Sequence, residues 1–235
     1  MTDDPSAAGS VEGKLPARDL VDVRLAAAIE LGGCALCAVR ARAERGTLDA
    51  IIAERVLDIG FREGLERDHG FCRRHAVGLI EADRRASGIL GSSILYGAMV
   101  GRRTAALREA FGWRGRGRRK RLTEVARRPP CSVCGQGVSA VETALGRLVQ
   151  RADDPAWAAA IADIPFCLDD LIALLAAAGD APAMAPLAEQ QLARLDALVR
   201  RLEGYAHHSA QDRRHLLTDD ERSAADEAAR LLGGG

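Results

Sequence analysis

The stretch GFCRRHAVGLI, residues 70–80, carries a cysteine and a histidine three positions apart at the predicted start of a helix. Residues i and i+3 lie on one helix face, so the Cys72 thiolate and the His75 imidazole can converge on one atom. A tetrahedral metal site needs two more ligands, and GGCALCAVR upstream offers Cys34 and Cys37. The combined pattern, C-x2-C-x34-C-x2-H, predicts one metal site made of these four residues.

A second set of cysteines repeats this pattern. PPCSVCGQG contains Cys131 and Cys134, and PFCLDDLIALLAAAG contains Cys167, with Asp170 where the first copy has a histidine. The spacing is C-x2-C-x32-C-x2-D, and all six cysteines of the chain fall into the two copies. We interpret the pattern as an internal repeat, which predicts a second metal site formed by Cys131, Cys134, Cys167 and Asp170.

The two predicted sites differ in their fourth ligand. Zinc is the expected ion, in one or two copies, because thiolate and imidazole ligands suit it; the alternative for the first copy is a set of buried, inert cysteines. For the second copy, the alternatives to Asp170 are a ligand from His207, His208 or His215, or a copy that holds no metal. His69, in HGFCRRH, is another candidate near the first site, but we expect it in a loop.

The hydrophobic pattern has the helical period throughout, which predicts an all-α protein. We expect a disordered N-terminus over residues 1–15, a helical metal-binding half over 16–111, a basic linker over 112–129, and a second helical metal-binding half over 130–235. The second half should end in a helix that begins with a capping box at TDDE, residues 218–221.

Composition limits the classes of partner and the compartment. The 235 residues contain 33 Lys and Arg against 33 Asp and Glu, so no net field attracts the whole chain to nucleic acid or membrane. The apolar run over 88–101 is too short to span a membrane, which takes about 20 apolar residues. The first residues lack the apolar region of a signal peptide, so we expect a cytoplasmic protein whose cysteines bind metal rather than form disulfides.

A local excess of positive charge lies in FGWRGRGRRKRLTEVARRPP, residues 111–130. Such a run can bind phosphates with an affinity that falls steeply with salt. The alternative is a solvated linker, because only Trp113 is available nearby for stacking on a base. The candidate nucleic-acid contacts are Arg114, Arg116, Arg118, Arg119, Lys120 and Arg121.

These elements together resemble a family of bacterial and archaeal proteins known only as a numbered domain of unknown function. In that family, C-x2-C and G-[FL]-C-x2-H elements occur twice in a helical protein. The resemblance covers nearly the whole chain, from AAAIELGGCALCAV to DDERSAADEAARLLGG. It implies a bacterial, helical, metal-binding protein and no activity, and this chain departs from it at Asp170.

No catalytic residue is predicted. The chain has no phosphate-binding glycine loop, no G-x-S-x-G elbow and no H-E-x-x-H motif, so we do not expect an enzyme. The leading hypothesis is a structural zinc protein that acts as an adaptor or regulator by binding another macromolecule. The alternatives are a zinc-thiolate redox switch, and a nucleic-acid-associated protein that uses the basic linker.

Overall fold

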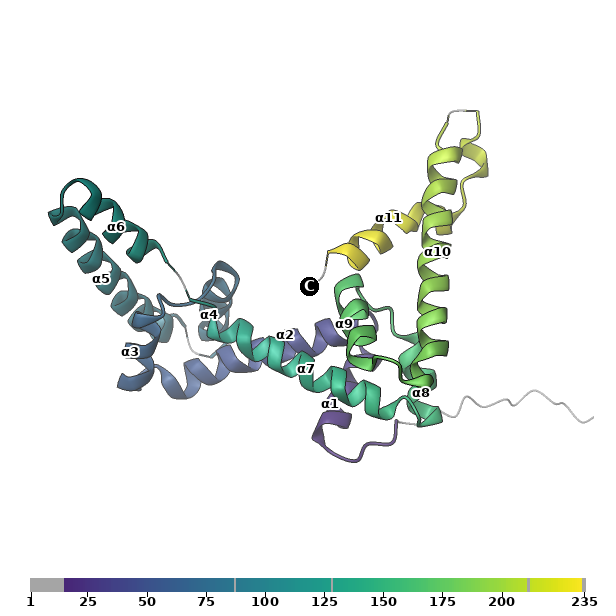
Figure 1. Ribbon diagram of the computed structural model, residues 1–235, viewed down its shortest axis with the longest axis horizontal. Coiled ribbons are helices and arrows are strands. Elements are labelled where there is room, and N and C mark those ends of the chain that lie inside the picture. Colours follow the sequence, from purple (N-terminus) through teal and green to yellow (C-terminus); the bar gives the residue numbers. More distant parts are fainter. Residues whose placement is uncertain (1–14, 87, 128, 211, 234–235) are drawn as a thin grey trace, which may run out of the picture. The chain divides into compact units, whose positions relative to one another are not determined.

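The computed structural model describes residues 15–86, 88–127, 129–210 and 212–233, and every regular element within them is helical (Figure 1). The predicted all-α class is therefore confirmed. The disorder expected over residues 1–15 falls, up to residue 14, outside the described residues. No described helix combines the length and apolar character that a membrane crossing requires. The α-helices are α1 (Leu20–Glu30), α2 (Ala35–Ala50), α3 (Ile59–Arg67), α4 (Arg73–Ala86), α5 (Leu90–Gly112), α6 (Gly115–Ala126), α7 (Ser132–Arg151), α8 (Pro155–Asp163), α9 (Leu168–Ala178), α10 (Ala185–His208) and α11 (Asp219–Leu232).

The chain forms two compact units that interleave along the sequence. Unit 1 contains the described residues up to Ala38 and those from Thr143 onward, and unit 2 contains Val39–Glu142. This division differs from the two consecutive halves, 16–111 and 130–235, that the sequence predicts. The reason is that α2 and α7 each contribute residues to both units, so the chain passes between units within a helix.

The predicted linker over 112–129 belongs to unit 2, and most of it is the helix α6. This helix packs on α5 to form a helical hairpin (Figure 1). Arg118 donates from Nε to the carbonyl of Trp113 (2.8 Å), and Arg103 donates from Nη2 to the carbonyl of Val125 (2.9 Å). Residues 115–126 therefore form a helix that packs on α5 rather than an irregular linker.

Local sequence signals explain several helix ends. Thr218 and Glu221 form the predicted capping box at the start of α11, with Thr218 Oγ1 accepting from the Glu221 amide (3.2 Å). Helix α1 ends before Gly32 and Gly33, which take φ values of 70° and 78°. A side chain at either position would be strained there, so the two glycines let the chain turn toward Cys34.

Each unit has its own hydrophobic core. In unit 2, Leu79, Leu95 and Phe71 pack in a core cluster that also contains Cys131. In unit 1, Trp157 is fully buried, and its indole Nε1 donates to the carbonyl of Pro16 (2.9 Å). That hydrogen bond attaches the segment before α1 to helix α8.

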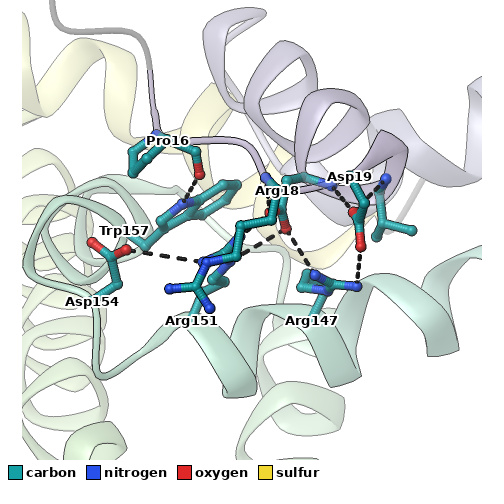
Figure 2. Close-up of polar contacts among 9 residues, drawn as sticks. Pro16, Arg18, Asp19, Arg147, Arg151, Asp154 and Trp157 are labelled. Carbon is teal, nitrogen blue, oxygen red and sulfur yellow. Dashed lines mark hydrogen bonds and ion pairs between the residues drawn. The ribbon is translucent and has the colours of Figure 1, made fainter.

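A buried ion pair reinforces the same attachment in unit 1. Figure 2 shows Arg147 and Arg151 of α7 directed toward the segment that carries Pro16, Arg18 and Asp19. Arg151 pairs with Asp22, and both side chains are almost completely buried. Asp22 also accepts from the Arg18 amide (2.8 Å) and from Arg147 Nη1 (3.3 Å). Donors from three different arginines thus meet on one carboxylate.

These contacts govern the charge of Asp22. Burial alone would raise the pKa of this carboxyl, but the hydrogen bonds from Arg151 and from the Arg18 amide, together with the attraction of Arg151 and Arg147, lower its pKa below the ordinary 3.8. The charged form is therefore the one that the fold stabilises. Its contribution is complete above pH 3.8 and is lost as the pH falls through the lowered pKa.

We expect Asp22→Asn to lower the thermal midpoint of unfolding by several degrees at pH 7, because it leaves the Arg151 charge buried without its partner. The matched control is Asp163→Asn, since Asp163 is 80% exposed in its pair with Arg194 and should change the midpoint little. Below pH 3.8, the difference between wild type and Asp22→Asn should shrink. Equal midpoints for the two variants at pH 7 would contradict this role.

Candidate metal centres

The eight predicted ligands meet in two clusters, but not in the predicted groups. Cys72 and His75 lie with Cys131 and Cys134 in unit 2. The second cluster, in unit 1, consists of Cys34, Cys37, Cys167 and Asp170. The predicted sets, Cys34–Cys37–Cys72–His75 and Cys131–Cys134–Cys167–Asp170, are therefore corrected: each cysteine pair joins the C-x2-H or C-x2-D element of the other copy.

The lengths of the helices agree with this exchange. From Cys34, α2 and the π-helical turn Ile51–Arg55 carry the chain about 30 Å in one direction, at 1.5 Å per residue. The single helix that follows before Cys72, α3, spans only about 14 Å. Helices α7 and α8 have the same proportions in the second copy. The third cysteine of each copy therefore does not lie beside the cysteine pair of its own copy. It lies beside the pair of the other copy.

All four ligand pairs occupy the first turn of a helix. Helices α2, α4, α7 and α9 begin at the residue directly after Cys34, Cys72, Cys131 and Cys167 respectively. The second ligand of each pair is the third residue of its helix. Amide groups at a helix start lack partners within the helix and carry partial positive charge, which favours thiolates and carboxylates there. Each cluster is thus built from two helix N-termini.

In the unit 2 cluster, His75 Nδ1 faces three sulfurs. It lies 3.3 Å from Cys72 Sγ, 3.5 Å from Cys131 Sγ and 3.3 Å from Cys134 Sγ, while Cys72 Sγ lies 3.8 Å from Cys134 Sγ. For zinc with Zn–S of about 2.3 Å and Zn–N of about 2.0 Å, a tetrahedron separates two sulfurs by about 3.8 Å and sulfur from nitrogen by about 3.5 Å. These four separations match that tetrahedron.

The unit 1 cluster has similar dimensions. Cys167 Sγ lies 3.9 Å from Cys34 Sγ and 3.6 Å from Cys37 Sγ, and Asp170 Oδ2 lies 3.2 Å from each of those two sulfurs. Within each cluster, the four ligand atoms all lie within 4.8 Å of one another. Asp170 is 2% exposed, so it is a buried carboxylate among three thiols. Both clusters can hold a four-coordinate ion.

Burial and crowding make the thiols costly to ionise without a cation. Burial raises the pKa of Cys34 to about 11, with Asp170 and Cys37 acting in the same direction against hydrogen bonds from backbone amides. Burial likewise raises the pKa of Cys134 to about 11, helped by Cys72 and Cys131, and it raises the pKa of Cys167 further. A bound divalent cation reverses this balance, because a coordinated thiol loses its proton.

Cys131 is the exception in the unit 2 cluster. Burial opposes its ionisation, but hydrogen bonds from the amides of Cys72, Cys134 and Val133 and the contact with the His75 side chain lower its pKa to about 7. Two of those amides, at Val133 and Cys134, belong to the first turn of α7. The helix start therefore favours the thiolate at this position.

The remaining histidine candidates lie elsewhere. Among the described residues, His69, His207, His208 and His215 belong to neither cluster. His208 Nδ1 instead lies 3.1 Å from Glu221 Oε1, and Arg213 Nη1 lies 3.0 Å from His207 Nε2. The alternative in which a distant histidine replaces Asp170 is therefore not the arrangement found.

The candidate nucleic-acid contacts fall into two groups. Arg118 and Arg121 are engaged within the hairpin, where their guanidinium groups lie over the rings of Phe111 (5.5 Å) and Trp113 (5.2 Å). In contrast, within the described residues no hydrogen bond or ion pair involves the side chains of Arg114, Arg116, Arg119 and Lys120.

One residue beside the unit 2 cluster carries no signal in the sequence. Glu44 of α2 is 6% exposed, and its Oε2 lies 3.1 Å from Nε2 of His75. No motif marks an acid at this position. Its position beside His75 depends on how α2, α4 and α7 pack, and the spacing of residues along the sequence does not reveal that packing.

Comparisons with known proteins found no matching family model, no matching curated protein and no matching solved structure. The class of protein rests on the fold and the two clusters alone: an all-helical protein with two sets of four side chains that can bind metal ions.

Proposed function

We propose that this protein is a structural zinc protein, in which two zinc ions each join a pair of helix N-termini and hold a helical scaffold that binds another macromolecule. The supporting observation is the tetrahedral spacing of the four ligand atoms in each cluster. Four protein ligands leave no open position for substrate or water, as is usual in structural rather than catalytic zinc sites. Metal binding would then contribute directly to the free energy of folding.

Paired substitutions test both the metal and the exchanged grouping. Wild-type protein should contain two zinc ions per chain, by elemental analysis of protein purified without chelator. Cys34→Ser combined with Cys167→Ser should leave one ion, because both residues serve unit 1. Cys34→Ser combined with Cys72→Ser should leave none, because each substitution removes a ligand from a different cluster.

The opposite pattern in these two double variants would support the grouping within each copy. A wild-type protein free of metal after purification, which also fails to bind added Zn²⁺, would contradict the proposal itself. Cobalt substitution provides a second readout, since tetrahedral thiolate coordination gives a visible absorption band that weakens with the loss of either site.

Asp170 offers a separate test of the unit 1 site. Asp170→Ala should weaken metal binding there and leave the unit 2 site unchanged, because the carboxylate oxygen is the fourth ligand atom of that cluster alone. Asp170→His should keep or tighten the ion by restoring a C-x2-H pattern. The measurement is competition with a chromophoric chelator. An unchanged unit 1 affinity in Asp170→Ala would exclude the carboxylate as a ligand.

A second candidate function, nucleic-acid association, is favoured by one feature of α6. No side chain of this helix is buried. Its positive charges therefore do not serve a core, and Arg116, Arg119 and Lys120 make no contact with an acidic side chain of the described chain. Arg119 and Lys120 follow Arg116 by three and four residues, which places the three side chains on one side of the helix. An unpaired cationic face of this kind suits a phosphate backbone.

We expect wild-type protein to bind mixed-sequence duplex DNA or RNA at low salt, and the triple variant Arg116→Gln, Arg119→Gln, Lys120→Gln to bind more weakly. Removing one cation that pairs with a phosphate should reduce the slope of log affinity against log salt by about 0.9 for duplex DNA. Fluorescence anisotropy over a salt series measures both quantities.

The matched control replaces three exposed arginines that lie outside α6, namely Arg45, Arg84 and Arg200, by Gln. It removes the same charge and should leave the slope near that of wild type. Equal decreases in the two triple variants would indicate a general charge effect, and no binding by wild type at low salt would remove this candidate function.

A further inference from the structure

Glu44 is a buried acid placed between a candidate metal ligand and an arginine. It lies in the part of α2 that belongs to unit 2 and is 6% exposed. Its Oε1 accepts from Arg74 Nη2 (2.8 Å), and its Oε2 lies 3.1 Å from His75 Nε2. The pair with His75 is within ion-pair distance but does not have the geometry of a hydrogen bond. A buried carboxylate is costly unless it is paired, and Arg74 supplies the compensating charge.

The surroundings of His75 differ at its two ring nitrogens. Nδ1 faces the three sulfurs of the cluster at 3.3–3.5 Å, and Nε2 faces the Glu44 carboxylate. An imidazole that binds a metal is neutral and keeps its proton on the other nitrogen, where a carboxylate commonly orients it. The position of Glu44 therefore matches the proton-bearing side of a ligating His75.

Gly137 on α7 makes the approach of Glu44 possible. A Cβ atom at this position would lie 2.7 Å from Glu44 Oε1, 2.9 Å from Glu44 Cγ and 3.0 Å from Arg40 Cγ. Real Cβ atoms essentially never approach another atom more closely than 3.0 Å. Gly137 follows Cys134 by three residues, so one face of α7 carries both a ligand and the space that the carboxylate occupies.

We propose that Glu44 is a positioning residue for the unit 2 metal site: it orients His75 with the proton on Nε2, so that Nδ1 points at the ion shared with the three thiolates. This inference rests on the proposed zinc binding. The unit 1 site needs no equivalent residue, because its fourth ligand, Asp170, has no tautomer to select.

Glu44→Gln should lower the zinc affinity of the unit 2 site by about 10- to 100-fold, the usual effect of losing a partner behind a metal-bound histidine. The affinity of the unit 1 site should not change. Gly137→Ala should act in the same direction, since it displaces the carboxylate without removing it. The matched control is Asp49→Asn, which removes the same charge from an exposed pair on the same helix. Chelator competition on the Cys34→Ser, Cys167→Ser background measures the unit 2 site alone, and competition on the chain with all unit 1 ligands measures the unit 1 site.

The tautomer of His75 in the intact zinc-bound protein provides a readout that loss of packing would not mimic. Nitrogen-15 NMR of wild type should show the proton on Nε2, and this measurement holds even if Glu44→Gln folds poorly. A proton on Nδ1 in wild type, or an unchanged unit 2 affinity in both Glu44→Gln and Gly137→Ala, would overturn the role of Glu44 while leaving zinc binding intact. Absence of any zinc from wild type would instead refute the proposed function.

Discussion

The start of a helix directly after a cysteine, which occurs four times in this chain, is the constraint on which both units depend. It places two ligand side chains in the first turn, beside amide groups that have no partner within the helix. Two such helix starts meet in each unit, and their four ligand atoms lie within 4.8 Å of one another. The partial positive charge of the helix starts and a divalent cation favour the same thiolates, so the backbone and the proposed ion act in the same direction.

The exchange of ligand pairs between the copies agrees with the helix geometry and is opposed only weakly by chain entropy. Joining Cys34 to Cys167 closes a segment of 133 residues, whereas joining it to Cys72 would close one of 38. Closure entropy grows only with the logarithm of length, so the longer connection costs about 1 kcal/mol more. That difference is too small to impose the shorter connection. The long helices that follow each cysteine pair lead the chain away from that pair. The short helices that come next are less than half as long and do not bring it back.

The buried carboxylates of Asp22 and Glu44 each have an arginine partner. Asp22 meets Arg151, Arg147 and the amide of Arg18, and Glu44 meets Arg74 beside His75. Helix α6 is different, because it exposes unpaired cations and buries no side chain. Arginine thus serves internal attachment in both units and, on α6, also an outward-facing surface.

Sequence alone determined the all-α class, the identity of the eight clustered side chains, the helix starts after Cys72 and Cys167, and the capping box at Thr218, because spacing and periodicity are local properties of the chain. It could not determine which cysteine pair joins which partner, since both copies have nearly the same spacing and either grouping satisfies a four-ligand site. It also did not indicate that residues 115–126 pack as a helix on α5, or that Glu44 lies behind His75. Those features depend on how far each helix carries the chain and on which side chains tertiary packing brings together, and only the three-dimensional structure contains that information.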